Sequence, residues 1–321
     1  MDTIVTFEDH SISSIIVPTQ KAFLPLLAAN RSKIESTERK TFRYGEHERH
    51  QLDVYCPAAS QGEGETKTKV PILFWIYGGG WVKGERANFS SLPGGDLVYK
   101  NIGSWFAERG FYVVIPDYRL LPHGAKFPDP IKDVRDAIVW VTQNASGVIS
   151  SPSRQRPDTS NIFLIGHSAG ASSVISLFLL PDMLPLGSPL REQINGIGLL
   201  SGSYETKNSP IPRTVHQYYG PADEDLERNS PIGLLRALSA RRLAVKIPNV
   251  LMSIVEYEPQ NLVEGNREFR DSMSKLLGIE AEWRVWKGHN HISLATALGS
   301  GSDGGEIFGE EIVDFLRSCL R

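Results

Sequence analysis

Hydrophobic residues along this chain gather into short runs that alternate with longer amphipathic stretches. Strand-like runs cover 41–44, 51–55, 70–77, 111–115, 161–165, 194–200, 250–255 and 282–286. Helix-like stretches near 97–109, 130–144, 171–180, 262–277 and 306–319 separate most of them. The run at 70–77 is typical of a strand buried on both faces. The alternation predicts an α/β fold, with a central, mostly parallel sheet flanked by helices.

Three segments fall outside this alternation. The first forty residues predict an irregular or helical lead-in with a buried stretch at 22–29. Residues 57–69 are polar and contain glycine, which predicts a surface loop. Residues 202–245 are rich in proline, glycine and charge, and we expect a small lid over the carboxyl edge of the sheet. Since α/β folds often exceed 250 residues as one unit, we expect a single domain over 1–321 with a lid insertion at 202–245.

Composition narrows the class of protein. Hydrophobic residues make up 40% and charged residues 22% of the chain, as in globular proteins, and the net charge of −3 gives no basic surplus for nucleic acid. Cys56 and Cys319, the only cysteines, give no disulfide framework and no metal-ligand spacing, which favours a reducing compartment. The acidic N-terminus lacks signal-peptide features, and no uninterrupted apolar run approaches the length of a membrane span. We therefore expect a cytoplasmic protein.

The most informative motif is Gly166-His-Ser-Ala-Gly170, which follows the run at 161–165 and precedes the helix-like stretch at 171–180. A GxSxG pattern between a strand and a helix predicts a nucleophile elbow, a sharp turn that raises the serine hydroxyl above the sheet. Taken alone, the pentapeptide also occurs by chance, for example at the start of a helix. Ser168 is therefore a candidate nucleophile only if the chain supplies partners for it.

A serine nucleophile needs a base, and the chain offers few. In doubly wound sheets of this type the chain order is serine, acid, histidine. Downstream of Ser168 there are three histidines, of which His216 falls in the expected lid. His289 and His291 follow the strand-like run at 282–286, at the carboxyl edge where such folds build their sites. Loop spacing favours His291 over His289 as the base.

The acid that orients the base is expected just after the preceding strand. Glu258 and Glu256 both lie at the end of the run at 250–255. We favour Glu258, because Glu256 is expected to stay on the strand or in hydrogen bonds of its own loop. Asp117 also follows a strand, but Asp117-Tyr-Arg119 is interpreted as a structural ion pair.

Main-chain N–H groups are expected to hold the oxyanion of an acyl-transfer reaction. Glycine after the run at 70–77 lets amides approach a substrate without obstruction by Cβ. The candidate donors are Gly79, Gly80 and, directly after the nucleophile, Ala169. Trp81 follows the glycines, and we expect it to form a wall of the acyl or alcohol pocket.

Taken together, these motifs resemble the α/β-hydrolase superfamily, and within it the branch of hormone-sensitive-lipase-like esterases and kynurenine formamidases. The resemblance extends from about Thr41 to the C-terminus. Its markers are the motifs at 52–57, 78–81, 117–120, 127–133, 166–170, 256–259 and 288–291. Two positions depart from the family pattern: Tyr77 stands where the glycine motif usually opens with histidine, and Glu258 where the family usually has aspartate.

The resemblance implies that Ser168 is the nucleophile, Glu258 the acid and His291 the base, with Gly79, Gly80 and Ala169 as oxyanion donors. We expect a serine hydrolase that cleaves small to medium carboxylic esters through an acyl-enzyme, with no metal and no organic cofactor. The same residues suit a formamidase-like amidase or a lactone or thioester hydrolase. A non-catalytic small-molecule receptor usually lacks a triad member and is disfavoured. The expected partner is a small-molecule ester or amide, and the sequence leaves the oligomeric state open.

Overall fold

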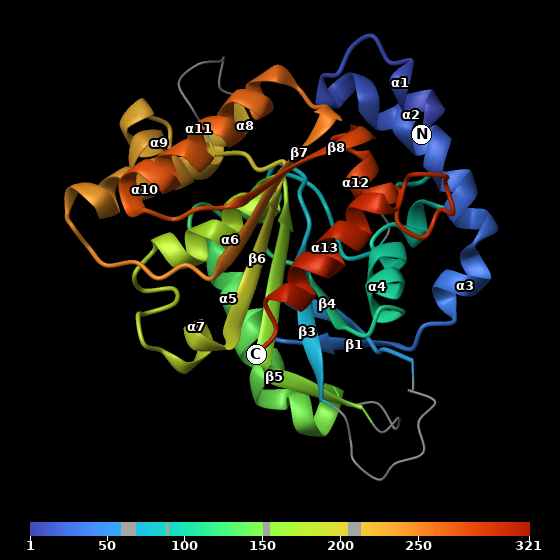
Figure 1. Ribbon diagram of the computed structural model, residues 1–321, viewed down its shortest axis with the longest axis horizontal. Coiled ribbons are helices and arrows are strands. Elements are labelled where there is room, and N and C mark those ends of the chain that lie inside the picture. The colour runs from blue at the N-terminus through green and yellow to red at the C-terminus, as the bar shows by residue number, and fades with distance from the viewer. Residues whose placement is uncertain (59–68, 88–89, 150–154, 205–212) are drawn as a thin grey trace.

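The computed structural model describes residues 1–58, 69–87, 90–149, 155–204 and 213–321. Within them, eight strands form one sheet in the order β1-β2-β4-β3-β5-β6-β7-β8 (Figure 1). The strands are β1 Arg39–Arg43, β2 Gln51–Tyr55, β3 Lys69–Ile76, β4 Tyr112–Pro116, β5 Arg156–His167, β6 Ile194–Leu200, β7 Asn249–Tyr257 and β8 Glu282–Asn290.

The sheet is mostly parallel, as the sequence predicted. β2 runs antiparallel to both β1 and β4, whereas the neighbours from β4 to β8 all pair in parallel. β3 lies in the centre, where Leu73 pairs with Val113 on one side and Phe163 on the other. These residues are fully buried, because helices cover both faces of the sheet and leave no polar face on the central strands.

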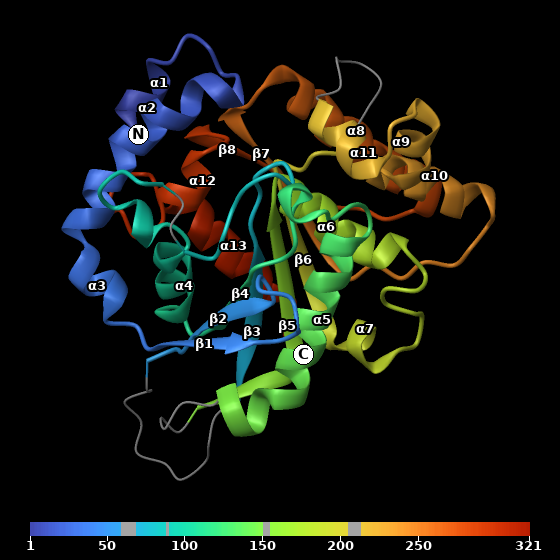
Figure 2. The same cartoon turned by 180° about the vertical axis from the view of Figure 1, so that it is seen from behind.

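Helices α5 and α6 cover one face of the sheet, and α4 and α13 cover the other (Figures 1 and 2). The last two pack tightly, since a Cβ at Gly309 would lie 2.5 Å from the Trp105 ring. These four helices and α11, which follows β7, are α4 Lys100–Ala107, α5 Asp129–Asn144, α6 Ala169–Leu179, α11 Gln260–Leu277 and α13 Ile307–Ser318. The shorter elements are α1 Asp2–Val5, α3 Arg31–Glu35, α7 Pro189–Gln193, α12 Ser293–Thr296, η1 Gly95–Leu97, η2 Leu121–His123 and η3 Ala145–Ile149.

The predicted lead-in is helical and lies beside the carboxyl ends of the strands. Helix α2 (Ile12–Ala29) buries Phe23, Leu24 and Leu27, so the stretch at 22–29 is buried on one face only, and Leu26 is exposed. Thr19, also buried on α2, accepts a 2.8 Å hydrogen bond from the side chain of Asn290 at the end of β8. This bond ties the start of the chain to the loop that carries the candidate base.

Helix α2 also corrects one expectation. Among the described residues it is the one helix long and apolar enough to cross a membrane, with a mean hydropathy of 1.4 over 18 residues. The sequence contains no uninterrupted apolar run of that length, because Gln20 and Lys21 interrupt α2. The mean hydropathy of the helix nevertheless stays high. One third (33%) of this window is buried inside the protein. A mostly buried core helix of a soluble protein and a signal sequence near the N-terminus pass the same test.

The described part of the segment expected to form a lid contains three helices, α8 Arg213–Tyr219, α9 Asp223–Asn229 and α10 Pro231–Ala240, which lie beyond the carboxyl edge (Figure 1). Its prolines and glycines do not prevent helices, because they occupy special positions. Pro231 opens α10, where it needs no hydrogen-bond donor, and Ser230 caps the helix through the N–H of Gly233. Residues 205–212 of this segment, and 59–68 of the expected surface loop, lie outside the described residues.

Candidate active site

Strand β5 delivers Ser168 to the carboxyl edge in a strained turn. Its φ of 54° and ψ of −124° place it in a region that residues with a side chain rarely adopt. The flanking glycines make the turn possible. A Cβ at Gly166 would lie 2.5 Å from the carbonyl oxygen of Gly170, and a Cβ at Gly170 would overlap that of Ile76. The turn leaves the Ser168 side chain at the surface of a cavity, half-buried and directly before α6.

His291 and Glu258 meet at the same edge. Nδ1 of His291 lies 2.6 Å from Oε1 of Glu258, and the two side chains are 3% and 0% exposed. The sheet explains the meeting, because β7 and β8 are parallel neighbours and the two residues follow their ends. The other carboxylate oxygen accepts from the Ser201 hydroxyl and, at 3.3 Å, from the N–H of Val255. A carboxylate only accepts, so the bonded nitrogen carries the proton and Nε2 of His291 is left as an acceptor.

The two competing residues have other contacts. Glu256 accepts from the N–H of Gly288 at 2.8 Å and from Lys287 at 3.3 Å, and the Gly288 bond is the main cause that lowers the pKa of Glu256. His289 places Nδ1 2.9 Å from the Ser293 hydroxyl, and burial lowers its pKa to about 4. The structure therefore brings Glu258 and His291 together and leaves Glu256 on β7 and His289 on β8, each with other partners.

His216, the third candidate base, lies on α8. Its Nε2 is 4.0 Å from the exposed carboxylate of Asp223. It has no place in the pair formed by His291 and Glu258, and it does not line the cavity that contains Ser168.

The glycine loop after β3 passes directly beside the nucleophile. A Cβ at Gly78 would lie 2.7 Å from Cβ of Ser168, and a Cβ at Gly79 would overlap the carbonyl oxygen of Lys83. Gly79 and Gly80 have φ of +117° and +61°. Within the described chain, the main-chain N–H groups of Gly79, Gly80 and Ala169 donate to no acceptor. These three donors lie along the cavity that Ser168 enters.

Tyr77, which replaces the histidine of the family motif, supports this loop from behind. Its hydroxyl donates to Oδ1 of Asp117 at 2.7 Å, and its ring stacks on Tyr118 with centroids 4.8 Å apart. Burial, and then the charge on Asp117, hold the pKa of Tyr77 well above its usual value. Arg49 donates to the carbonyl of Gly84 at 2.7 Å and to the Tyr77 hydroxyl at 2.9 Å. Both ends of the glycine loop are thereby attached to one buried cluster.

The ion pair expected within 117–119 forms with different partners. Asp117 accepts from the guanidinium and, at 2.6 Å, from the main-chain N–H of Arg86. Arg119 instead donates to Asp133, with a shortest separation of 2.7 Å. Asp117 is therefore part of a structural ion pair, but its partner is Arg86, which follows the glycine loop. The pair helps to hold that loop beside Ser168.

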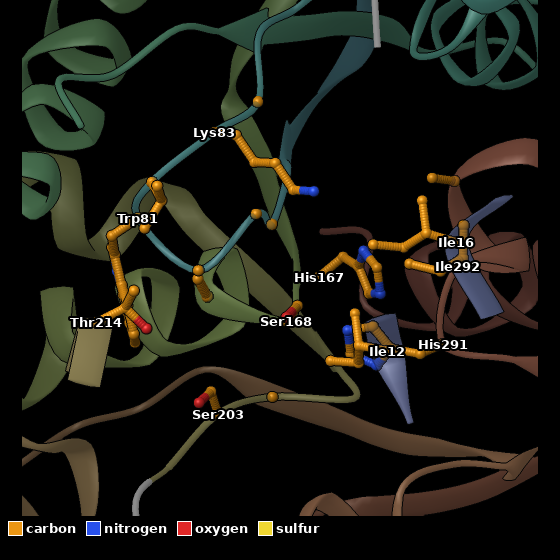
Figure 3. A pocket seen from close by; sticks show the side chains of 18 of the residues that line it. Ile12, Ile16, Trp81, Lys83, His167, Ser168, Ser203, Thr214, His291 and Ile292 are labelled. Carbon is orange, nitrogen blue, oxygen red and sulfur yellow. The ribbon is translucent and has the colours of Figure 1, made fainter. Parts of the chain in front are cut away.

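The candidate residues open into a cavity of about 990 Å³ (Figure 3). Trp81 and Thr214 lie on one side of Ser168, and isoleucines 12, 16 and 292 lie on the other. Trp81 lines this cavity, is buried and stacks on Tyr218 of α8 with ring centroids 4.3 Å apart, and its role as a wall of the substrate pocket stays a prediction. Most of the lining is apolar, and the described residues contain no group of three or more metal-binding side chains.

Sequence reasoning missed four contributors to this site. Ser201, which holds Glu258, directly follows the run at 194–200, and its place at the carboxyl edge was the available signal. Arg49 and the residues of α2 carry no motif. His167 is buried beside the nucleophile, with its ring centroid 4.8 Å from that of His291. Burial, and then repulsion from His291 when that ring is protonated, hold the pKa of His167 well below its usual value, so His167 stays neutral.

Comparison with known proteins shows which proteins this chain resembles. The BD-FAE family model matches residues 52–178, which include the glycine loop and the elbow. A probable isoprenylcysteine α-carbonyl methylesterase of Arabidopsis thaliana is 27% identical over 81% of this chain and 58% of its own length. Kynurenine formamidase of Salmo salar is 25% identical over 80% of this chain and 76% of its own. The chain spans only 51–62% of the length of the Arabidopsis methylesterases it matches.

Solved structures agree on the fold. Esterase B of Lactobacillus rhamnosis matches with a TM-score of 0.65 at 14% identity, covering 96% of this chain and 95% of that one. Carboxyl esterase 2 of Tuber melanosporum matches with a TM-score of 0.63 at 19% identity, covering 89% and 88%. The chain shares the α/β-hydrolase fold of these esterases.

Proposed function

We propose that this protein is a serine hydrolase that cleaves carboxylic esters through an acyl-enzyme intermediate. The observation that carries the proposal is the buried His291–Glu258 hydrogen bond of 2.6 Å at the cavity that Ser168 lines. A buried carboxylate bound to a histidine fixes its tautomer and supports the positive charge that it acquires as a base. The relatives named as esterases, a formamidase and a lipase support ester hydrolysis as the general class of activity.

The proposed reaction begins when Nε2 of His291 takes the proton of Ser168 and the Ser168 oxygen attacks the ester carbonyl. The N–H groups of Gly79, Gly80 and Ala169 stabilise the negative charge on the carbonyl oxygen. His291 then gives its proton to the departing alcohol, which leaves an acyl-enzyme. Water repeats the sequence, with His291 as its base, and releases the acid and free Ser168.

Within the described residues, the Ser168 hydroxyl makes no hydrogen bond. This agrees with the proposed role, because the bond between nucleophile and base is often long without substrate and shortens in the reacting complex. Glu258 has one methylene more than the usual aspartate, and the Ser201 hydroxyl holds its second oxygen. We infer that this bond positions the longer side chain for His291.

Thr214 and Val215 of α8 line the cavity, which supports the proposal that 202–245 acts as a lid within one domain. The first residues of α2 line the opposite wall of the cavity. A cytoplasmic location also stays part of the proposal, supported by the two cysteines, which are free and buried.

A formamidase-like amidase is the second candidate. The salmon kynurenine formamidase favours it, because the match covers more of that relative (76%) than of the plant methylesterase (58%). Lactone and thioester hydrolysis would use the same groups. A non-catalytic receptor has less support, since the chain keeps serine, glutamate and histidine.

The decisive experiment measures hydrolysis of p-nitrophenyl esters from acetate to decanoate, and of an aryl formamide, by wild type and Ser168→Ala. We expect ester turnover that falls to background in Ser168→Ala. A fluorophosphonate should phosphonylate the Ser168 oxygen in the wild type, with loss of fluoride, and leave the variant unmodified. Faster turnover of the formamide would favour the amidase, whereas folded wild type that neither turns over nor reacts would contradict a serine hydrolase.

A further inference from the structure

Lys83 lies on the glycine loop and is held beside the candidate oxyanion donors. Its main-chain N–H donates to the carbonyl of Gly79 at 3.2 Å, and its own carbonyl fills the place that a Cβ on Gly79 would need. The side chain is exposed and lines the cavity. Figure 3 shows the ammonium group directed into the space above Ser168, between the Trp81 side and the isoleucine side. The backbone thus fixes where this cation enters the cavity.

The positive charge of Lys83 has no partner among the described residues, unlike its neighbour Arg49. Arg49 also lines the cavity, but it donates to two main-chain carbonyls and the Tyr77 hydroxyl, and lies 3.7 Å from Asp117. Glu85 is the acidic residue of the lining, and it makes no ion pair with Lys83. Burial, and then the charge on Asp117, raise the pKa of Glu85.

The other titratable groups of the lining do not neutralise Lys83. His291 is bound to Glu258, His167 is buried and neutral, and burial raises the pKa values of Tyr99 and Tyr204 above their usual range. The walls on both sides of Ser168 are mainly apolar. An ammonium group between apolar walls attracts an anion more strongly than one in open water.

We propose that Lys83 binds a carboxylate of the substrate, and that the preferred substrates are esters carrying a free carboxylate near the scissile bond. This inference rests on the proposed ester hydrolysis and names its substrate class. The apolar walls would hold the carbon skeleton, and the carboxylate would point toward the glycine loop. Lys83 is then a specificity residue, and neutral esters remain substrates of the same chemistry.

The test compares matched pairs of charged and neutral esters. One pair carries the charge on the acyl side, p-nitrophenyl hemiadipate against p-nitrophenyl methyl adipate. The other carries it on the leaving group, 4-acetoxybenzoate against its methyl ester. In at least one pair we expect the wild type to favour the charged ester in kcat/KM by about fivefold, the upper range for a partly exposed ion pair. The preference should shrink as salt is raised from low to high concentration.

Substitutions at Lys83 separate the effect of its charge from a general effect on catalytic activity. Lys83→Met should abolish the preference and change kcat/KM of the neutral esters less than about twofold, and Lys83→Arg should retain it. Lys83→Glu should reverse it. Lys275→Met, which removes an exposed lysine from the last turn of α11, is the matched control and should change nothing.

Two results would overturn the inference while leaving the ester hydrolase intact. One is equal or better hydrolysis of the neutral ester in both pairs by the wild type. The other is a preference for the charged ester that Lys83→Met leaves in place. If folded wild type hydrolyses neither the charged nor the neutral esters, the proposed function itself fails.

Discussion

The imidazole of His291 and the carboxylate of Glu258 are joined by a 2.6 Å hydrogen bond that neither side chain shares with solvent. Replacing Glu258 with glutamine keeps the shape but lets the amide favour the wrong tautomer. We expect Glu258→Gln to lower kcat by about 10³- to 10⁴-fold, as such replacements do in serine hydrolases. Steady-state kinetics on a p-nitrophenyl ester measure the loss. The matched control Glu256→Gln, whose carboxylate contacts Lys287 and the N–H of Gly288 and not His291, should stay near wild type. A large loss there and none at Glu258 would reverse the assignment.

Gly79 and Gly80 offer a direct comparison within the glycine loop. A Cβ at Gly79 would overlap the main chain of Lys83, whereas nothing lies within 4 Å of a Cβ at Gly80. Both have positive φ, so each alanine variant pays a conformational cost of about 1 kcal/mol. Gly79→Ala should additionally displace the loop and lower kcat about 100-fold or more, the effect of losing an oxyanion donor. Chemical denaturation and kinetics measure both, and equal effects of the two variants would contradict this packing.

A substitution at Tyr77 can test how the buried cluster of Tyr77, Asp117 and Arg49 supports the glycine loop, without disturbing the packing of the rings. Tyr77→Phe keeps the stacking on Tyr118 but removes the hydrogen bond to buried Asp117, which should destabilise the fold by about 1–3 kcal/mol. Because the cluster positions oxyanion donors, we expect kcat to fall while KM stays nearly constant. Tyr44→Phe, which removes a buried hydroxyl bonded to the Asp117 carbonyl, is a control for stability alone. A rise in KM with unchanged kcat would place the cluster in substrate binding instead.

Acid should destabilise the protein through its buried histidines. Burial lowers the pKa of His289 to about 4, so the folded state binds fewer protons than the unfolded state between pH 6.5 and pH 4. Stability is therefore complete above pH 6.5 and falls as the pH drops, by up to about 3 kcal/mol for this group. His167 acts in the same direction. Urea unfolding from pH 7 to pH 4 tests this, and His289→Gln should flatten the curve; an unchanged slope would exclude the assignment.

The sequence predicted the central sheet well, because buried strands leave continuous apolar runs. The runs at 51–55 and 194–200 match β2 and β6 at both ends, and α5 begins one residue from its predicted start. The short helix Pro189–Gln193 and the helices of the expected lid were not predicted, since proline and glycine there suggested irregular chain. Helices that begin at a proline and pack against the sheet follow from tertiary contacts.

The candidate site could be predicted where a local motif ends a strand, as at Ser168, Glu258 and His291. Contacts between distant segments leave no such signal. Arg49 reaches Tyr118, 69 positions away, and Thr19 meets Asn290, 271 positions away. The error at Asp117 has the same origin: Arg119 is its neighbour in sequence, but Arg86 is its neighbour in space.

The cavity wall contributed by Ile12 and Ile16 comes from a helix that precedes the whole sheet in the chain. The groups proposed to perform the reaction all come later, from the strand ends. Substitutions in the first turns of this helix can therefore reshape the space for a substrate without displacing a reacting atom. Evolution, or an engineer, could alter what this protein accepts by changing a short stretch of the gene and leave the reaction machinery untouched.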